Sequence, residues 1–228
     1  MIFIIKNKCK KLLNVFNLLK KHSYFNINYK WIKIMEHKQI INTILYEISQ
    51  VLNSVNENKI DEFVDMLYDI KNNNNKIIGY SAGRMGLSLK AFIMRLNHLG
   101  IHANFYNDTY IPPMSENDMF VCCSNSGTTK SVYSILDIFK KKANGKIVSF
   151  VGNNDSVIAN NSDLSIEFLT CNGGMNSEDN DKKLTSIQPM TTVTEQSMMI
   201  LFDLIVLKLI DKLNIKIAET KKYHSNIE

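Results

Sequence analysis

The sequence predicts an α/β fold in which a parallel β-sheet lies between layers of helices. From residue 76 onward, short apolar segments alternate with stretches of helical periodicity, which is typical of parallel sheets covered on both faces. The chain has 228 residues, of which 45% are hydrophobic and 21% charged, with only 9 Gly and 3 Pro. This composition excludes disordered and collagen-like chains and suits one compact domain with appendages.

Two consecutive helices are expected between Glu36 and Ile70. Apolar residues recur there with the spacing of one helix face. These residues are Ile40, Ile41, Ile44, Leu45, Ile48, Val51, Leu52, Ile60, Phe63, Val64, Leu67 and Ile70. The tract 72–75, which consists of four Asn, interrupts the pattern, and residues 76–80 read as a short buried strand.

Helices and strands continue to alternate along the chain. A helix over residues 83–99 ends at Gly100, a residue typical of helix C-termini. Another helix is expected over 129–142. The remaining strands are expected near residues 102–106, 119–123, 146–151 and 164–168.

The last part of the chain contains a polar segment and a long helix. Residues 171–185 are polar and contain Gly, so a mobile loop is expected there. Residues 190–213 predict a helix whose second half is apolar on nearly every side. Such a helix is buried from several directions, either at a subunit interface or at the centre of one subunit.

Positive charge is concentrated at the start of the chain. Residues 1–34 contain eight Lys and no acidic residue, although the whole chain has a net charge of only +5. In a secretory signal the positive charge precedes the apolar run, whereas here the apolar residues come first. A mitochondrial presequence would be rich in Arg and Ser. A basic membrane-surface helix stays open as an alternative. We expect a basic N-terminal extension outside the fold, with residues 35–228 as the functional domain.

Composition also argues against several classes of partner. Nucleic-acid binding is not expected, because 25 of the 27 basic residues are Lys, whereas readers of phosphates and bases rely on Arg. No segment reaches the roughly 18 apolar residues of a membrane span, so a soluble, cytoplasmic protein without membrane contact is expected. The Cys and His residues show neither CxxC nor HExxH spacing, and neither a disulfide scaffold nor a metal site is expected.

A cluster of hydroxyl side chains follows the expected strand at 119–123. In a parallel sheet, ligands bind where a strand ends and the next helix begins, and backbone N–H groups there hold phosphate. Capping the helix needs one hydroxyl, whereas this turn has five in eight residues. The candidate phosphate-binding residues are Ser124, Asn125, Ser126, Gly127, Thr128, Thr129, Lys130 and Ser131.

The turn matches neither common nucleotide-binding pattern. It lacks the spacing of a Walker A loop, and residues 79–86 lack the G-x-G-x-x-G pattern of dinucleotide sites. The turn instead resembles the S-x-S-G-x-T loop of the sugar isomerase (SIS) family of phosphosugar-binding domains.

Other segments resemble the 6-phospho-3-hexuloisomerases of this family. Residues 82–87 and 94–100 are similar to Ala-Gly-Arg-Ser-Gly and Met-Arg-Leu-x-His-Leu-Gly. Residues 186–190, followed by Glu195 and Gln196, are similar to Ile-Gln-Pro-Met and Phe-Glu-Gln, and residues 224–228 to His-Ala-Asn-Leu-Glu. The matches run in order from about residue 36 to the last residue.

The resemblance implies a three-layer α/β/α fold with a five-stranded parallel sheet, of the SIS type and flavodoxin-like, commonly assembled as a homotetramer. It implies interconversion of 3-hexulose 6-phosphate and fructose 6-phosphate in the ribulose monophosphate route of formaldehyde fixation, with no metal or organic cofactor. Residues 124–130 would hold the phosphate, and Glu195 matches the proton acceptor of the family.

The chemistry of this reaction suits the candidate residues. Moving a carbonyl from C3 to C2 requires removal of the C2 proton, an enediolate, and return of a proton to C3, which one carboxylate can perform. Glu195 is the candidate base, although an acidic residue also suits a helix N-terminus. His224 is the second catalytic candidate or else a surface residue, and Arg84 either contacts the ligand or pairs with a carboxylate.

Several positions depart from the family pattern. Met85 stands where the family has a ligand-contacting Ser, and Ser81, which replaces Gly, is expected to supply a substitute donor. Asn125 replaces Gly, Thr128 replaces a charged residue, and Thr194 replaces Phe. Two alternatives therefore stay open: an aldose-ketose isomerase for another sugar phosphate, and a phosphosugar sensor without catalysis.

Overall fold

The computed structural model describes residues 35–172, 183–224 and 226–227. The chain divides into two compact units, residues 1–43 and residues 44–228. In the described part of the first unit, helix α3 (His37–Asn53) begins, and the Thr43 hydroxyl donates a hydrogen bond to the Gln39 carbonyl at 2.9 Å. The expected basic extension lies outside the described residues.

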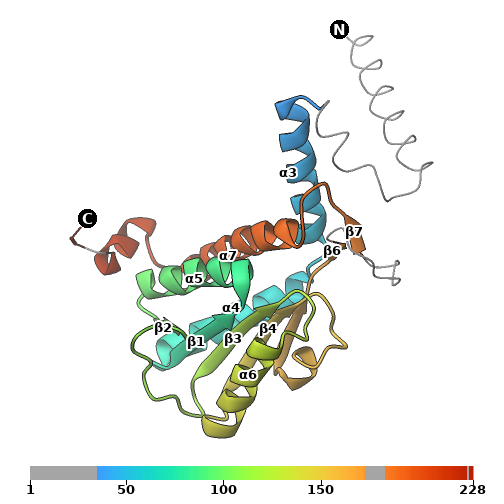
Figure 1. Ribbon diagram of the computed structural model, residues 1–228. Helices are drawn as coiled ribbons and strands as arrows, with labels where there is room; N and C mark the ends of the chain where they lie inside the picture. Colours follow the sequence, from blue (N-terminus) through green and yellow to red (C-terminus); the bar gives the residue numbers. More distant parts are fainter. Residues whose placement is uncertain (1–34, 173–182, 225, 228) are drawn as a thin grey trace. The chain divides into compact units, whose positions relative to one another are not determined.

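The second unit is built on a five-stranded parallel sheet (Figure 1), which confirms the predicted fold class. The strand order is β2-β1-β3-β4-β5, and the central strand β3 is buried at every position. The strands are β1 (Lys76–Ser81), β2 (His102–Phe105), β3 (Met119–Ser124), β4 (Lys146–Val151) and β5 (Leu164–Glu167).

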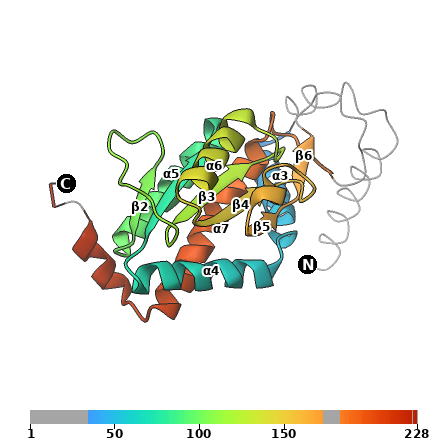
Figure 2. The same ribbon diagram turned by 90° about the horizontal axis from the view of Figure 1, so that it is seen from below.

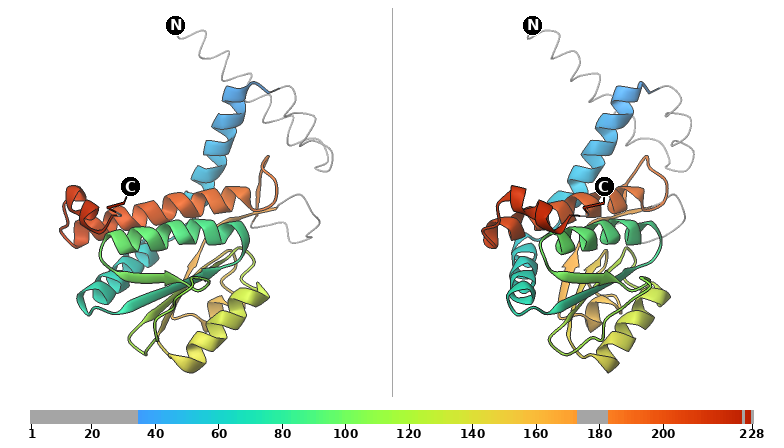
Figure 3. Two further views of the ribbon diagram at one scale, coloured as in Figure 1. Left: turned by 60° about the vertical axis from the view of Figure 1, so that its left-hand side comes forward. Right: turned by 90° about the vertical axis from the view of Figure 1, so that its left-hand side faces the viewer.

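Helices cover both faces of this sheet (Figures 2 and 3). Helices α4 (Glu57–Asn72), α5 (Gly83–His98) and α7 (Thr192–Lys212) pack on one face, and α6 (Lys130–Lys142) packs on the other. Helix α5 connects β1 to β2, toward one edge of the sheet, whereas α6 connects β3 to β4, toward the other edge. Because such crossovers are right-handed, the two helices lie on opposite faces, and the strand order reverses between β1 and β3.

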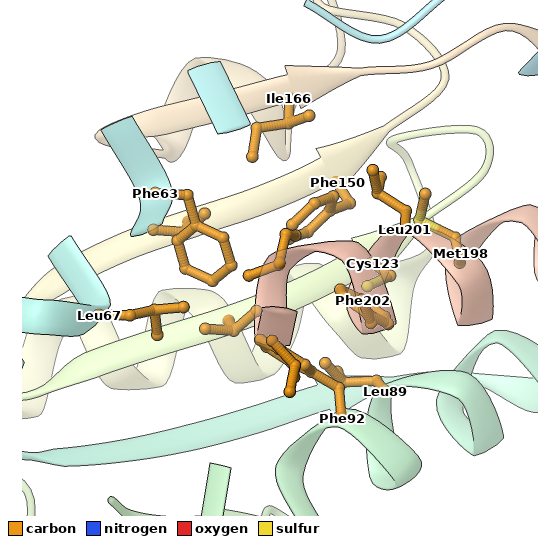
Figure 4. Close-up of a cluster of buried hydrophobic side chains, with 14 of the residues drawn as sticks. Phe63, Leu67, Leu89, Phe92, Cys123, Phe150, Ile166, Met198, Leu201 and Phe202 are labelled. Carbon is orange, nitrogen blue, oxygen red and sulfur yellow. The ribbon is translucent and has the colours of Figure 1, made fainter. Parts of the chain in front are cut away.

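Phenylalanine side chains join the helices to the sheet in the larger core (Figure 4). Phe92 of α5 stacks on Phe202 of α7 with ring centroids 4.5 Å apart. Phe150 of β4 meets Phe202 edge-on at 5.1 Å and Phe63 of α4 at 5.5 Å. One aromatic cluster therefore connects α4, α5 and α7 to a central strand.

Helix ends in this unit follow local sequence signals. The Asn56 side chain accepts a hydrogen bond from the Asn58 amide at 2.9 Å, which caps the start of α4. Gly100, at φ +72°, ends α5 as predicted, and the Ile101 amide donates to the Leu96 carbonyl at 3.0 Å across it.

Helix α7 is apolar on both its buried and its exposed side, as expected. Its inner face enters the larger core and includes Met198, Leu201 and Phe202. Its outer face exposes Met199, Ile200, Leu204 and Leu207, and the neighbouring helix α5 exposes Leu87 and Met94. Apolar side chains on an outer face are typical of a surface that another molecule covers.

The segment expected to be a mobile loop has structure at both ends. Strands β6 (Thr170–Asn172) and β7 (Lys183–Thr185) pair in a second, two-stranded sheet. The residues between them lie outside the described part of the chain. The described part of this unit also contains the 3-10 helices η1 (Ala159–Asn161) and η2 (Ile217–Tyr223). Within the described ranges, no helix has the length and apolar character needed to cross a membrane.

Candidate functional site

The candidate site begins where strands β1 and β3 end next to each other. The strand order reverses between these two strands, and ligands of such sheets bind at the carboxyl ends beside the reversal. The Ser81 hydroxyl donates a hydrogen bond to the Cys123 carbonyl at 2.8 Å, which ties the two strand ends together. The sheet therefore brings the predicted ligand-binding segments 81–85 and 124–131 to one edge.

The hydroxyl turn, residues 124–131, is braced by its own side chains. The hydroxyl oxygens of Ser124 and Thr129 lie 2.8 Å apart in a hydrogen bond, and Ser124 Oγ also accepts from the Gly127 amide at 3.1 Å. Ser126 Oγ accepts from the amide and the hydroxyl of Thr128 at 3.2 and 3.1 Å. These bonds shape the turn before any ligand binds.

Gly127 is the position where the hydroxyl turn requires glycine. Its φ is +67°, and a Cβ there would lie 2.0 Å from Ser156 Oγ. The Ile158 amide donates a hydrogen bond to the Gly127 carbonyl at 3.1 Å. The turn thus rests against the segment that follows β4, and a side chain at residue 127 would force the two apart.

The amino end of α6 has the properties of an anion site. Thr129 precedes the helix but makes no capping bond to a backbone amide, because its hydroxyl pairs with Ser124. The first helical turn contains no acidic residue, and Lys130 and Ser131 are exposed there. Uncapped N–H groups, the positive end of the helix dipole and nearby hydroxyls together favour a phosphate group.

Glu195 lies in the first turn of α7 and is held on both carboxylate oxygens. The Thr191 hydroxyl donates to Oε1 at 2.9 Å, and Arg84 Nε lies 3.3 Å from Oε2. The Ser88 hydroxyl of α5 donates to the Glu195 carbonyl at 2.9 Å. The side chain is only 13% exposed. This carboxylate is therefore oriented and partly shielded from water, as a proton-transferring group needs to be.

Arg84 joins the amino ends of α5 and α7. Besides its ion pair with Glu195, its Nη1 donates a hydrogen bond to Thr192 Oγ1 at 3.2 Å. About half of the Arg84 side chain stays exposed. Arg84 was expected either to contact the ligand or to pair with a carboxylate, and the structure shows the pair with Glu195. The exposed half of the Arg84 side chain is accessible to a ligand.

Three of the sequence-predicted site residues have their side chains directed inward. The Met85 side chain is 6% exposed and belongs to the hydrophobic core, so it does not line the site in this structure. The Ser81 hydroxyl donates to the Cys123 carbonyl in this structure, and its role as a substitute donor stays a prediction. Asn125 Oδ1 is buried without a hydrogen-bond partner among the described residues.

His224 is not brought to Glu195 within one chain. Its ring lies next to that of His98, with centroids 5.1 Å apart, at the carboxyl end of α5. Arg84 and Glu195 lie at the amino end of the same helix. At about 1.5 Å of rise per residue, these two ends of α5 are roughly 20 Å apart.

The two adjacent cysteines are structural. Cys122 and Cys123 belong to the two different core clusters on opposite sides of the sheet. Burial raises the pKa of both thiols, so both stay protonated and unreactive near neutral pH. In the described ranges, no group of three His, Cys, Asp or Glu side chains is arranged to hold a metal ion.

Sequence reasoning missed Glu47, which contacts the segment leading to Glu195. Its carboxylate in α3 is 3% exposed and accepts hydrogen bonds from Ser186 and the Ile187 amide. A signal was present, because Glu47 lies three residues after Ile44 and four before Val51, on the face that these apolar residues share. A charged residue in such a stripe needs a buried partner.

Together the fold and the strand order define a doubly wound α/β protein, a class in which ligands bind at the reversal of strand order. The family model described as "SIS domain" matches residues 72–204. The chain therefore belongs to the SIS domain family, as its motifs predicted.

Individual relatives agree with this family. The 3-hexulose-6-phosphate isomerase of Bacillus subtilis is 29% identical over 184 residues, covering 79% of this chain and 97% of that protein. The 3-hexulose-6-phosphate isomerase of Methanocaldococcus jannaschii is 28% identical, covering 86% and 98%. A crystal structure of a hypothetical protein from Methanococcus jannaschii, from which the same molecular function was inferred, has a TM-score of 0.66 and 26% identity, covering 85% and 100%.

Proposed function

We propose that this protein is a phosphosugar isomerase that interconverts 3-hexulose 6-phosphate and fructose 6-phosphate. The names of the relatives support this reaction. The observation that carries it is the environment of Glu195, a nearly buried carboxylate held by Thr191 and Arg84 at the edge of the sheet where the hydroxyl turn begins. A binding module without catalysis needs the turn but no oriented carboxylate.

The hydroxyl turn is proposed to bind the phosphate of the substrate. Its candidate donors are the amides at the start of α6 and the hydroxyls of Ser124, Ser126, Thr128, Thr129 and Ser131. Lys130 adds a positive charge at the same helix end. Binding the phosphate there leaves the sugar carbons free to extend toward Glu195.

Glu195 is proposed to move the proton between two sugar carbons. Its carboxylate takes the proton from C2, and the electrons of the C–H bond form the C2–C3 double bond while the C3 carbonyl becomes an enediolate oxygen. The proton of the C2 hydroxyl moves to the oxygen on C3, and Glu195 returns its proton to C3, which leaves a carbonyl at C2. Proton transfer alone completes this isomerisation, so the proposed reaction uses no metal or organic cofactor.

A homo-oligomer, specifically a tetramer, is part of the proposal. The exposed apolar side chains of α5 and α7 support an interface on this side of the molecule. An oligomer would also allow His224 of one chain to approach Glu195 of another. In that arrangement His224 transfers the proton between the two substrate oxygens.

The biological setting is proposed from the reaction. A protein of this activity acts in the ribulose monophosphate route of formaldehyde fixation, in the cytoplasm. Residues 35–228 are proposed as the functional domain.

One assay tests the proposed function. Purified protein is incubated with 3-hexulose 6-phosphate, and formation of fructose 6-phosphate is measured. Turnover of another sugar phosphate alone favours an aldose-ketose isomerase. Tight binding of sugar phosphates without any turnover favours a phosphosugar sensor.

A further inference from the structure

Glu47 holds three consecutive residues through its buried carboxylate. Ser186 Oγ donates to Glu47 Oε2 at 2.7 Å, the Ile187 amide donates to Oε1 at 2.8 Å, and Gln188 Nε2 donates to Oε2 at 3.2 Å. Both carboxylate oxygens are used. An unpartnered buried carboxylate is costly, so this contact strongly constrains the segment that supplies its donors.

The constrained segment leads directly into α7. Ser186 Oγ accepts a hydrogen bond from the Gln188 amide at 2.9 Å, which closes a tight turn around the carboxylate. The Pro189 carbonyl then accepts bonds from the Thr192 amide at 3.2 Å and the Thr192 hydroxyl at 2.7 Å. The peptide bond between Gln188 and Pro189 thus joins the hydrogen bonds of Glu47 to those at the first residue of the helix.

The same path continues to Glu195. Thr192 Oγ1 accepts from Arg84, whose Nε pairs with the Glu195 carboxylate, and the adjacent Thr191 donates to that carboxylate directly. The side chains that orient Glu195 therefore lie on, or are bonded to, the residues that follow the turn held by Glu47.

We propose that Glu47 is a positioning residue for Glu195. It fixes the turn at residues 186–188, the turn fixes the amino end of α7, and this end directs the Glu195 carboxylate. The proposal rests on the proposed role of Glu195 as the base. The hydrogen bonds of Glu47 in the described residues go to residues 186–188 and not to the hydroxyl turn, so the expected effect is on proton transfer rather than on phosphate binding.

The first experiment compares two buried carboxylates. Glu47→Gln keeps the shape of the side chain but directs an NH₂ group toward hydrogen-bond donors. Asp118→Asn is the matched control, because Asp118 is 1% exposed and accepts bonds from the amides of Lys76 and Ser115 at the opposite end of the strands. Glu47→Gln is expected to lower kcat about 10- to 100-fold with KM changed less than about twofold, whereas Asp118→Asn leaves kcat unchanged below its unfolding temperature.

A double variant separates positioning from general destabilisation. If Glu47 acts through Glu195, adding Glu47→Gln to Glu195→Gln causes no further loss of kcat. An equal loss in both backgrounds overturns the proposal, and so does a Glu47→Gln variant with the kcat of the wild type. If Glu47→Gln does not fold, Ser186→Ala removes one of the three bonds and is expected to lower kcat in the same direction, to a smaller extent.

Hydrogen exchange tests the positioning step without relying on turnover. The amides of residues 187–197 are expected to exchange faster in Glu47→Gln than in wild type, while those of residues 124–135 exchange equally in both. Unchanged exchange at 187–197 overturns the proposal. A wild type that does not convert 3-hexulose 6-phosphate refutes the proposed function instead, and the exchange result still decides whether Glu47 fixes the start of α7.

Discussion

The Thr191 hydroxyl donates a hydrogen bond to Glu195 Oε1 at 2.9 Å, four residues further along the chain. Thr191 is the residue that precedes α7, a position where a hydroxyl ordinarily caps a backbone amide, yet it makes no capping bond. The helix therefore gives up a stabilising cap while the carboxylate gains an orienting partner. This exchange is typical of a side chain positioned for a reaction rather than for stability.

Replacing Glu195 by Gln tests the base directly. Glu195→Gln keeps shape and hydrogen-bonding reach but cannot accept the proton, so kcat is expected to fall on the order of 10²- to 10⁴-fold with KM little changed. Steady-state kinetics with 3-hexulose 6-phosphate measure this. A variant that retains more than about a third of the wild-type rate would show that another group is the base.

Replacing two hydroxyls tests the hydroxyl turn. Ser126→Ala combined with Thr129→Ala is expected to raise KM strongly, because losing two hydrogen bonds to a charged phosphate costs about 3 to 6 kcal/mol. Ser134→Ala is the matched control, since its hydroxyl bonds to the Lys130 carbonyl within α6, outside the turn. An unchanged KM in the double variant would place the phosphate elsewhere.

Removing the Arg84 charge tests the ion pair with Glu195. Arg84→Met is expected to lower kcat on the order of 10- to 100-fold, because Glu195 and Thr192 both lose a partner that orients them. Since Arg84 is about half exposed, stability should change little. The control is Lys90→Met, which removes a charge from the same helix next to Phe105. Equal kcat in the two variants would contradict a role in orienting Glu195.

The ionised carboxylate of Asp118 is expected to stabilise the wild type relative to Asp118→Asn by an amount that depends on pH. Burial alone would raise the pKa of Asp118, but hydrogen bonds from Lys76 and Ser115 and the charge of Lys76 outweigh it and lower this pKa. The ionised carboxylate therefore contributes stability above its unfolded pKa of about 3.9, and the contribution is lost as pH falls through the lower folded pKa.

The corresponding measurement is denaturant unfolding at several pH values. At pH 7, Asp118→Asn is expected to lose about 1 to 3 kcal/mol of unfolding free energy, and the difference from wild type should shrink in acid. Asp137→Asn, which breaks only a surface pair with Lys141, is expected to change the unfolding free energy much less than Asp118→Asn does. Equal losses of unfolding free energy in the two variants would show that the buried hydrogen bonds of Asp118 stabilise the fold no more than a surface ion pair does.

Mixing two inactive variants tests whether His224 acts across chains. Glu195→Gln and His224→Ala chains are unfolded together and refolded as mixed oligomers. If each site combines Glu195 of one chain with His224 of another, a random mixture regains about a quarter of the wild-type activity. Mixtures no more active than the separate variants would contradict a site that combines Glu195 of one chain with His224 of another.

Much of the fold follows from local sequence patterns. The five strands and helices α5, α6 and α7 lie within a few residues of their predicted positions, because apolar periodicity and the Gly100 stop signal act over short stretches. The paired ends of the 171–185 segment were not foreseen, since β6 and β7 each have only three residues.

The site was predictable only where motif residues lie close to one another in the chain. The hydroxyl turn is such a case. The pairing of Glu47 with Ser186 spans 139 residues, and no periodicity in either segment encodes the partner of the other. The inward direction of Met85 likewise depends on which face of α5 meets the sheet.

The contact between Gly127 and the segment at 156–158 makes the shape of the hydroxyl turn depend on residues that come about 30 positions later in the chain. During synthesis, residues 124–131 are made before β4 and before the residues that support the turn. The Ile158 amide and Ser156, which contact the turn, follow β4 in the chain, and β4 pairs with β3, the strand that leads into the turn. A chain that ends before residue 156 therefore contains the hydroxyl turn but lacks the residues that support its shape.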